Sequence, residues 1–552
     1  MNSLSGRFIQ MIIIIVTGIL FIPFLGNVHL FDWDEINFAE AAREMIKTGN
    51  FLTVQIDYHP FWEKPPLFIW MQVISMKIFG INEFAARFPN AIGGIVTSLV
   101  LFNIGKTIRD ARTGIIWVAV YICSILPFFY FKSGIIDPWF NLFIFLSVYY
   151  SFRFTLSNQP SNKIFYIVLS ALFTGLGILT KGPVALLIYG LTFGIYGIIK
   201  MFKIKANVSH FIWFSMTLVI VGGFWFILQF INGNSKLILD FISYQIRLFH
   251  TKDAGHGGFF LYHFLVLFIG VFPASVFAIR SFKIEKKQDR ETIHEFKNWM
   301  MILFWTVLIL FTIVKTKIVH YSSICYFPLS FLATYVIVKL IERKEDIPKW
   351  MNRLLITVAV IWGLIIVIIQ LIGNYSSQII SSGIIQDPFA NGNLQANVPW
   401  SGLEWMIGVG FVLAICLLVA FKKLNNQLKI FGILFCTLLF TNLTLILITP
   451  KIEGYSQRAA IEFYQERKNE DCYIQPIGFK TYAHLFYANK RIPDNPQCFS
   501  ESWLLTGSID KPVYFVMKIG ERDKFLAKYP QIKILYQKNG FVFAKREISN
   551  DN

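Results

Sequence analysis

DWDEINFAEAAREMIKTGNFLTVQIDYHPFWEKPP, residues 32–66, is the stretch that decides how this chain folds. It directly follows a first apolar segment, residues 8–25, and it carries two groups of charged side chains close to the end of that segment. Carboxylates and amines at a bilayer surface are costly unless they are paired, hydrated or functional. The position of this stretch therefore predicts a polar site at the membrane surface.

The first half of this stretch has the pattern of a short interfacial helix, residues 34–48. Its apolar positions recur at near-helical spacing, at Phe38, Ala42, Met45 and Ile46. Asp32 with Glu35 three residues later would form a capping box, and Gly49 suits the C-terminal cap. Asp32 and Glu35 therefore have a structural alternative as helix caps, whereas such a cap does not require Asp34.

The composition places the chain among polytopic helical membrane proteins. Of 552 residues, 55% are hydrophobic and 17% aromatic, and the mean hydropathy is +0.55. The short apolar run 67–79 is assigned to the interface. Thirteen spans are expected, at residues 8–25, 88–105, 113–131, 138–155, 164–180, 183–199, 210–231, 259–280, 298–314, 321–340, 353–373, 402–421 and 429–449.

The net charge of +18 is distributed as the positive-inside rule expects, which argues against nucleic-acid binding. Residues 374–401 contain no Lys or Arg and belong to the opposite side. The amino terminus is therefore predicted to be cytoplasmic, and an odd number of spans places the carboxyl terminus outside. The basic residues of the predicted inner side include Lys106, Arg109, Arg112, Lys200, Lys203, Lys205, Lys283, Lys286, Lys287, Arg290, Arg343, Lys344, Lys349, Arg353, Lys422 and Lys423.

The composition changes after the last span, so two domains are expected: a membrane domain, residues 1–449, whose first outer loop is 28–87, and a segment of residues 450–552. In this segment, β-like runs at 513–517 and 532–536 flank a helical run at 521–529, which predicts a small extracytoplasmic α/β domain. It shows no catalytic pattern and could serve as a structural lid. Cys472 and Cys498 could form a disulfide there if the segment is outside the membrane.

Unusual polar residues converge on the predicted outer side. Several cations and a few carboxylates in one cavity suit a lipid-linked phosphate or diphosphate. Each residue also has a plainer explanation: Lys181 could snorkel, Arg247 could pair with an acidic neighbour, and Asp137 could cap a helix. The converging residues are Asp34, Glu63, Lys64, Asp137, Lys181, Arg247, His250, Lys252, His256, Lys315, Lys317, His320 and Tyr321.

Three motifs, DWDEINFAEAAREM, FWEKPPLFIW and NEFAARFPNAIGG, carry a family resemblance. They resemble the first extracytoplasmic loop of polyprenyl-phosphate-sugar-dependent glycosyltransferases with the GT-C fold, nearest the aminoarabinose transferase and protein O-mannosyltransferase-like branch. The similarity extends through residues 1–330. It implies a GT-C-like membrane enzyme, a hexosyl- or pentosyltransferase of the outer face of a bacterial-type cytoplasmic membrane. Its donor would be an undecaprenyl-type phosphosugar, and its acceptor lipid A, a protein or another glycan.

The resemblance also implies roles for individual residues. Asp34 is the expected base, with Glu35 and Asp137 as further catalytic candidates, and a divalent metal would be held by Glu63 and His256. The sequence departs from one motif of the resembled family, in which a Lys and a Tyr are closely followed by a Pro. Here Lys317 and Tyr321 are present, but Pro328 comes seven residues after Tyr321, which puts the role of Tyr321 in doubt. The expected phosphate ligands are Lys64, Lys181, Arg247, Lys317 and Tyr321.

Two other classes of function remain compatible with a polytopic basic protein. A transporter or flippase of lipid-linked sugars would place ionisable residues near the bilayer midplane on broken helices. A protein that binds lipid-linked sugars without catalysis would share the cavity but would not turn over the donor.

Overall fold

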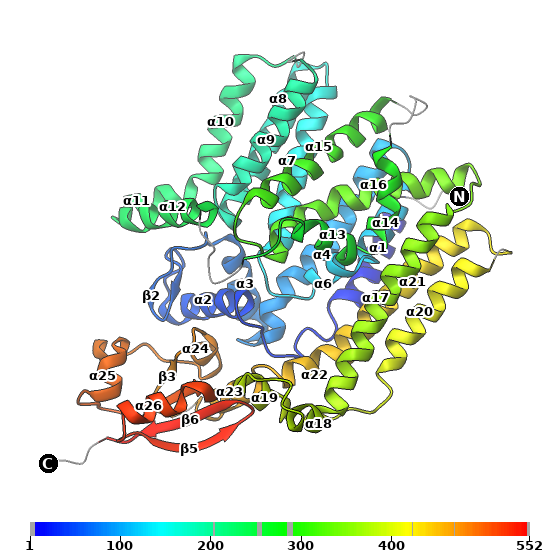
Figure 1. Cartoon of the computed structure of the whole chain (residues 1–552). Helices are drawn as coiled ribbons and strands as arrows, with labels where there is room; N and C mark the ends of the chain where they lie inside the picture. The colour runs from blue at the N-terminus through cyan, green and yellow to red at the C-terminus, as the bar shows by residue number, and fades with distance from the viewer. Residues whose placement is uncertain are drawn as a thin grey trace.

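The computed structural model describes residues 6–201, 205–250, 257–283, 291–421, 423–468 and 470–548, without the side chains of 248–250. Helices form a large bundle, and a small mixed domain lies beneath one side of it (Figure 1). The bundle contains α1 (Gly6–Phe21), α4 (Glu83–Ile108), α5 (Ala111–Ile122), α6 (Ile125–Tyr130), α7 (Asp137–Leu156), α8 (Pro160–Lys181), α9 (Val184–Ile199), α10 (Val208–Gly222), α11 (Phe224–Ile231), α13 (Tyr262–Gly270), α14 (Ala274–Ile279), η2 (Arg280–Phe282), α15 (Glu291–Ile313), η3 (Val319–Cys325), α16 (Tyr326–Glu342), α17 (Lys349–Asn374), α20 (Trp405–Ala420), α21 (Asn426–Leu443) and η4 (Thr444–Ile448).

The expected apolar segments are all helical within the described residues, which confirms a multi-pass membrane protein. By length and composition, six helices can cross a bilayer, or up to eight if two bent pairs each count as one span. The bend of 56° between α10 and α11 lies at Gly222 and Gly223, and the bend of 115° after α13 precedes Pro273 at the start of α14. Glycine pairs and proline are the usual causes of such breaks. The count of thirteen spans stays a prediction.

The basic loops meet at one end of the bundle. Arg109, directly after α4, pairs with Glu342 of α16, and Arg280 of η2 pairs with Glu345. Helix α4 begins at the first loop and is 26 residues long, which corresponds to roughly 39 Å. The basic end therefore lies a full helix length from the first loop, as the charge pattern requires.

The first loop folds into α2 (Asp34–Thr48), the short strands β1 (Gln55–Ile56) and β2 (His59–Pro60), and α3 (Leu67–Phe79). The predicted helix 34–48 and its C-terminal cap are confirmed, because Gly49 has φ 70° and its N–H reaches the carbonyl of Met45. The structural alternative, a capping box between Asp32 and Glu35, is not formed. Trp33 is the N-cap residue and makes no side-chain cap hydrogen bond, since Glu35 is engaged elsewhere.

The C-terminal segment forms a four-stranded sheet. Its strands follow one another in the order β3 (Tyr473–Ile477), β4 (Val513–Lys518), β6 (Phe541–Arg546) and β5 (Lys533–Lys538), and only the β3–β4 pair is parallel. The expected runs at 513–517, 521–529 and 532–536 correspond to β4, α26 and β5. Three further helices, α12 (Ser235–His250), α18 (Ser376–Ser381) and α19 (Pro388–Leu394), lie before the C-terminal segment, in connections of the helical bundle. The segment contains α22 (Thr449–Gly454), α23 (Arg458–Glu466), β3 (Tyr473–Ile477), α24 (Ala483–Tyr487), η5 (Pro496–Phe499), α25 (Glu501–Thr506), β4 (Val513–Lys518), η6 (Ile519–Glu521), α26 (Arg522–Lys528), β5 (Lys533–Lys538) and β6 (Phe541–Arg546).

The central strands β4 and β6 are buried on both faces, and the domain shares one core with the first loop. Strand β4 alternates, so that Phe515 points into the domain's own core while Val516 joins a core that includes Phe38 of α2. Lys490 forms an ion pair with Asp57 at 2.6 Å. The possible disulfide between Cys472 and Cys498 is not formed in this structure, where both thiols are free.

Candidate functional site

A cavity of about 460 Å³ lies beneath the first loop, where α2, α7, α8, α12 and η3 approach one another. Part of its wall is apolar and includes Val28, Leu445 and Ile446. The rest is polar. Its ionisable lining residues are Asp32, Asp34, Glu35, Glu63, Lys64, Arg87, Lys132, Asp137, Lys181, Tyr130, Tyr244, His320 and Tyr321.

Asp34 lies at the first position of α2 and faces His320 of η3. The distance from its Oδ2 to His320 Nε2 is 3.7 Å, and the Asp34 side chain is 33% exposed. On the other side of the imidazole, Tyr130 Oη is 2.8 Å from His320 Nδ1. This contact orients the ring toward Asp34, and the carboxylate stays accessible to a molecule in the cavity.

Glu35, the next residue, is 5% exposed and its carboxylate is fully engaged. Arg87 Nε donates to Oε1 at 2.9 Å and Arg87 Nη2 donates to Oε2 at 2.7 Å. The backbone N–H groups of Phe31 and Gly134 also donate to this carboxylate. Burial alone would raise the pKa of Glu35, but the Arg87 charge and these hydrogen bonds outweigh it and lower that pKa. Glu35 therefore does not fit the expected catalytic role, because no free oxygen of it faces a substrate.

Arg87 links two of the motifs of the sequence, since it lies in NEFAARFPNAIGG and pairs with Glu35 of DWDEINFAEAAREM. Its guanidinium donates to the carbonyls of Leu25, Val28 and His29, and thereby joins α4 to the chain that leads into the first loop. The pair is bidentate and buried, which is the strong form of such a contact. It fixes the position of α2 and hence that of Asp34.

Asp137 and Lys181 form an ion pair in the cavity wall. Lys181 Nζ lies 2.6 Å from Asp137 Oδ1, and the side chains are 15% and 2% exposed. The same amine lies over the ring of Tyr321, 5.7 Å from its centroid. Lys181 therefore does not snorkel away from the cavity, and Tyr321 is a cavity residue.

A second group of residues surrounds Tyr244 of α12. Its hydroxyl donates to Glu63 Oε2 at 3.3 Å, and Lys64 Nζ lies 5.5 Å from its ring centroid. Arg247, one turn later on α12, stacks on the same ring with Cζ 5.1 Å from the centroid. Lys64 and Glu63 line the cavity, whereas Arg247 lies beside it on an exposed face of α12.

The structure corrects the prediction for Lys317. Its amine donates to the carbonyls of Phe311, Thr312 and Val314, which are the last acceptors of α15. An ammonium has three donors, and all three are satisfied here. Lys317 caps a helix and does not line the cavity.

Six ionisable residues that line the cavity are not part of the expected site: Asp32, Arg87, Tyr130, Lys132, Tyr244 and His320. The sequence places His320 among the converging residues but assigns it no role. Lys132 follows α6 and donates to the carbonyl of Pro23 at 2.7 Å, and burial lowers the pKa of Lys132 to about 8. A signal existed for Lys132, because a lysine between two apolar spans on the predicted outer side is an exception to the positive-inside rule.

The expected metal site is incomplete in the part of the chain that the structure describes. Glu63 is described, whereas His256 lies outside the described residues, as do Lys252 and the side chain of His250. Among the described side chains, no group of three or more His, Cys, Asp or Glu is placed to hold a metal ion.

These features define a membrane-embedded helical protein whose cavity combines a carboxylate, several amines and an apolar wall. ArnT from Cupriavidus metallidurans bound to undecaprenyl phosphate has the same fold, with a TM-score of 0.76, 15% identity and coverage of 99% of both chains. Its apo state gives the same TM-score with 98% coverage of each chain. The GT-C fold expected from the motifs is thus confirmed.

Sequence comparisons agree with this fold. Residues 63–225 match the family of dolichyl-phosphate-mannose-protein mannosyltransferases. An undecaprenyl phosphate-alpha-4-amino-4-deoxy-L-arabinose arabinosyl transferase of Pectobacterium carotovorum is 23% identical over 62% of this chain and 62% of its own length. A similar transferase of Proteus mirabilis is 26% identical over 59% and 58%. The matched region thus spans about three fifths of the length of these relatives.

Proposed function

We propose that this protein is an integral-membrane glycosyltransferase that takes a sugar from an undecaprenyl-type phosphate donor. The observation that carries this proposal is the cavity in which Asp34 shares one space with the amines of Lys64, Lys132 and Lys181, next to an apolar wall. A lipid-linked sugar phosphate needs such a combination, because its chain is apolar and its head is anionic. The named activities of the relatives support the same class of donor.

The proposal includes the topology that the charge pattern predicts. Thirteen spans would place the amino terminus in the cytoplasm and the cavity at the outer face of the cytoplasmic membrane. Residues 1–449 would form the transferase domain, and residues 450–552 an extracytoplasmic domain. The core shared by this domain and α2 suggests that it holds the first loop in place, because Lys490 pairs with Asp57 of that loop.

In the proposed reaction, Asp34 acts as the general base. The acceptor hydroxyl loses its proton to the Asp34 carboxylate while its oxygen forms a bond to the anomeric carbon of the donor sugar. The bond between that carbon and the phosphate oxygen breaks, and its electron pair stays on the phosphate. His320 is a positioning residue, held by Tyr130 and facing Asp34.

The amines of the cavity would neutralise the leaving phosphate, whose charge grows as the glycosidic bond breaks. Lys64, Lys132 and Lys181 line the space directly, and Asp137 holds Lys181 in its wall. Arg247 would join from the side of α12 through its stacking on Tyr244. The divalent metal that the resemblance implies would be held by Glu63 together with His256, and of these two only Glu63 lies among the described residues.

Turnover by the purified protein tests the proposal. The chain is incubated with undecaprenyl phosphate carrying 4-amino-4-deoxy-arabinose or mannose, and with lipid A, a hydroxyl-bearing peptide or a glycan as acceptor. Products are identified by mass spectrometry. Asp34→Asn should lower turnover by at least ~100-fold without loss of the folded protein. Asp523→Asn is the matched control, because Asp523 lies on α26 with a side chain 95% exposed.

Donor binding provides a second test. Arg247→Ala should weaken donor affinity and turnover together, and Arg247→Lys should restore only part of both because it loses the planar fork. Lys106→Ala, at the opposite end of α4, should change neither. If Asp34→Asn keeps near-normal turnover, the base lies elsewhere. Transport of the donor across vesicles without any product would instead favour the transporter interpretation.

A further inference from the structure

A second and larger cavity lies at the other end of the bundle. Its volume is about 820 Å³, and it is an open groove between α9 and α15. Helix α9 begins three residues after Lys181 and ends next to Lys200, which lines the groove. Sixteen residues of α9 correspond to roughly 24 Å, so the basic end of the groove at Lys200 and the outer cavity at Lys181 lie at opposite ends of α9.

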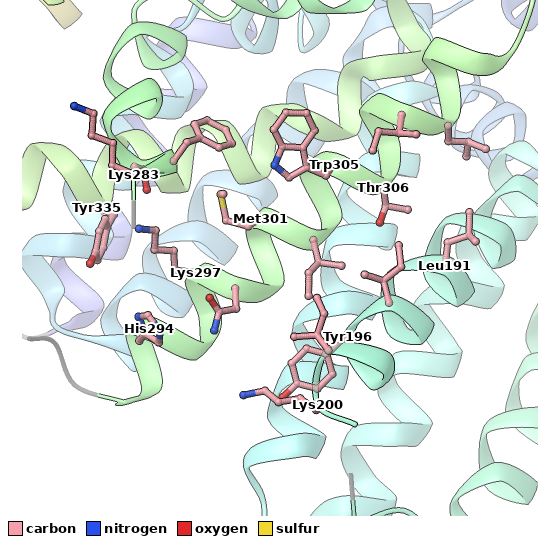
Figure 2. A pocket seen from close by; sticks show the side chains of 18 of the residues that line it. Leu191, Tyr196, Lys200, Lys283, His294, Lys297, Met301, Trp305, Thr306 and Tyr335 are labelled. Atoms are coloured by element: carbon pink, nitrogen blue, oxygen red, sulfur yellow. The ribbon is translucent and has the colours of Figure 1, made fainter. Parts of the chain in front are cut away.

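The two sides of this groove differ in chemistry. Figure 2 shows Lys283, Lys297 and His294 on the left, Lys200 at the bottom beside Tyr196, and Trp305, Thr306 and Leu191 toward the upper right. None of the described residues that line the groove is Asp or Glu. The nearby Glu295 is already engaged by Lys200 Nζ at 2.9 Å and by the hydroxyl of Tyr196 at 2.6 Å. The described lining of this side is therefore basic, and the charge of one of its lysines, Lys200, is offset by Glu295.

The apolar side has the character of a lipid contact. Its exposed side chains stand on α9 and α15, where a bilayer would cover them: Leu191 38%, Ile195 37%, Trp305 40%, Ile309 52% and Ile313 72%. Trp305 lies eleven residues after His294 on α15, which corresponds to roughly 16 Å along the helix. A molecule that fills the groove therefore needs a polar head and a tail of at least that length.

Two buried hydroxyls indicate that the groove is built for a ligand. Ser281 Oγ and Thr306 Oγ1 line the groove, the residues are 3% and 6% exposed, and neither oxygen has a hydrogen-bond partner among the described residues. Buried polar atoms are normally hydrogen-bonded. An occupant with oxygen atoms in its head would supply a partner for the Ser281 hydroxyl, which lies at the basic side, whereas Thr306 lies further along α15 beside Trp305.

We propose that this groove binds an anionic glycerophospholipid, with its phosphate among Lys283, Lys297 and His294 and an acyl chain between α9 and α15. The charge of the basic side selects the anionic head, and the exposed apolar side chains of the two helices accept the chain. The ester oxygens of the lipid lie next to its phosphate, near the hydroxyl of Ser281, which is two residues from Lys283. This site is separate from the outer cavity, and the proposal does not depend on the proposed transferase activity.

Quenching by brominated lipids tests the proposal on the purified full chain in vesicles. The contribution of Trp305 is isolated as the difference between the wild-type protein and Trp305→Phe. Trp213 on α10, also 40% exposed, is the matched control and is isolated in the same way. Each is measured with dibrominated phosphatidylglycerol and with dibrominated phosphatidylcholine. At each tryptophan the association constants for the two lipids are compared as a ratio. A difference between the two tryptophans in their depth in the bilayer affects both lipids equally and therefore cancels.

At Trp305 the association constant for phosphatidylglycerol should exceed that for phosphatidylcholine about fivefold or more, since one basic residue near a membrane contributes about that factor. At Trp213 the ratio should be near one. Lys283→Gln, an exposed position that tolerates change, should lower the Trp305 ratio, whereas Lys349→Gln, exposed at the start of α17, should not.

Three outcomes would overturn the proposal. Equal quenching by both lipids at Trp305 would mean that the groove is only an apolar surface. The same selectivity at Trp213 as at Trp305 would mean general attraction to the charged bilayer. Displacement of brominated phosphatidylglycerol by an equal amount of undecaprenyl phosphate, but not by unbrominated phosphatidylglycerol, would mean that the groove holds a polyprenyl lipid instead.

Discussion

Replacement of Glu35 by Gln separates a structural carboxylate from the chemical one beside it. Glu35 and Asp34 are adjacent, both line the outer cavity, and both are acids. The structure nevertheless gives them different surroundings: Arg87 occupies both oxygens of Glu35, whereas Asp34 is one third exposed and faces His320. Glu35→Gln keeps the size of the side chain and removes only the charge, so it tests the ion pair alone.

The expected effect follows from what the substitution leaves behind. Arg87 is 4% exposed, and without Glu35 its charge would be buried with only the carbonyls of Leu25, Val28 and His29 as acceptors. Removal of one partner from a buried ion pair costs about 3–5 kcal/mol. Replacement of both partners, in Glu35→Gln with Arg87→Met, should cost less than the sum of the single changes because no unpaired charge remains.

The assay is the fraction of monodisperse protein that survives heating in detergent, measured beside turnover at a temperature where every variant is folded. Glu35→Gln should clearly lower the temperature at which half of the protein remains monodisperse. At a temperature where this variant is folded, it should keep most of the turnover of the wild type. Asp34→Asn should do the reverse, with normal survival and at least ~100-fold less turnover. If Glu35→Gln is as stable as the wild type but loses activity as Asp34→Asn does, then Glu35 is catalytic and the structural role assigned to it is wrong.

Three further predictions concern the cavity and the C-terminal domain. Because burial lowers the pKa of Lys132 to about 8, its charge is present below that pH and is lost above it, so donor affinity should fall as pH rises from about 7 to 9. Lys132→Met should remove this pH-dependent step and Lys106→Met should keep it; an identical pH profile in Lys132→Met would exclude a contact with the phosphate. A metal held by Glu63 predicts loss of turnover in chelator and recovery with a divalent ion, and full turnover in chelator would refute it. Cys472→Ala should leave non-reducing mobility unchanged, since Cys472 and Cys498 are free thiols, and a shift would show that they pair.

The sequence by itself determined the class of the fold and the end of the molecule where the site lies. Long apolar segments exclude a soluble protein whatever their packing. Helix 34–48 follows from the near-helical spacing of its apolar residues, which are only three or four positions apart. Asp34, Lys64 and Lys181 were found in the same way, because charged residues beside apolar spans are rare enough to stand out. Such signals are local, so neighbouring residues in the sequence are sufficient to read them.

Only the tertiary structure decided which of these charged residues remain available for chemistry. Adjacent residues at the start of a helix point about 100° apart, so Asp34 faces the cavity while Glu35 faces Arg87, a residue 52 positions away. Lys317 lies in a promising motif, yet the end of α15 takes all its donors.

The same distinction explains the residues that the sequence did not select. His320 is one of several converging polar residues in the sequence, and only η3 shows that it lies within 3.7 Å of Asp34, with its ring held by Tyr130 from another helix. The C-terminal sheet looked separate along the chain, but its apolar positions complete a core with α2. Hydropathy and spacing depend on neighbours in sequence, whereas the pairing of buried charges and the completion of a core depend on segments that only folding brings together.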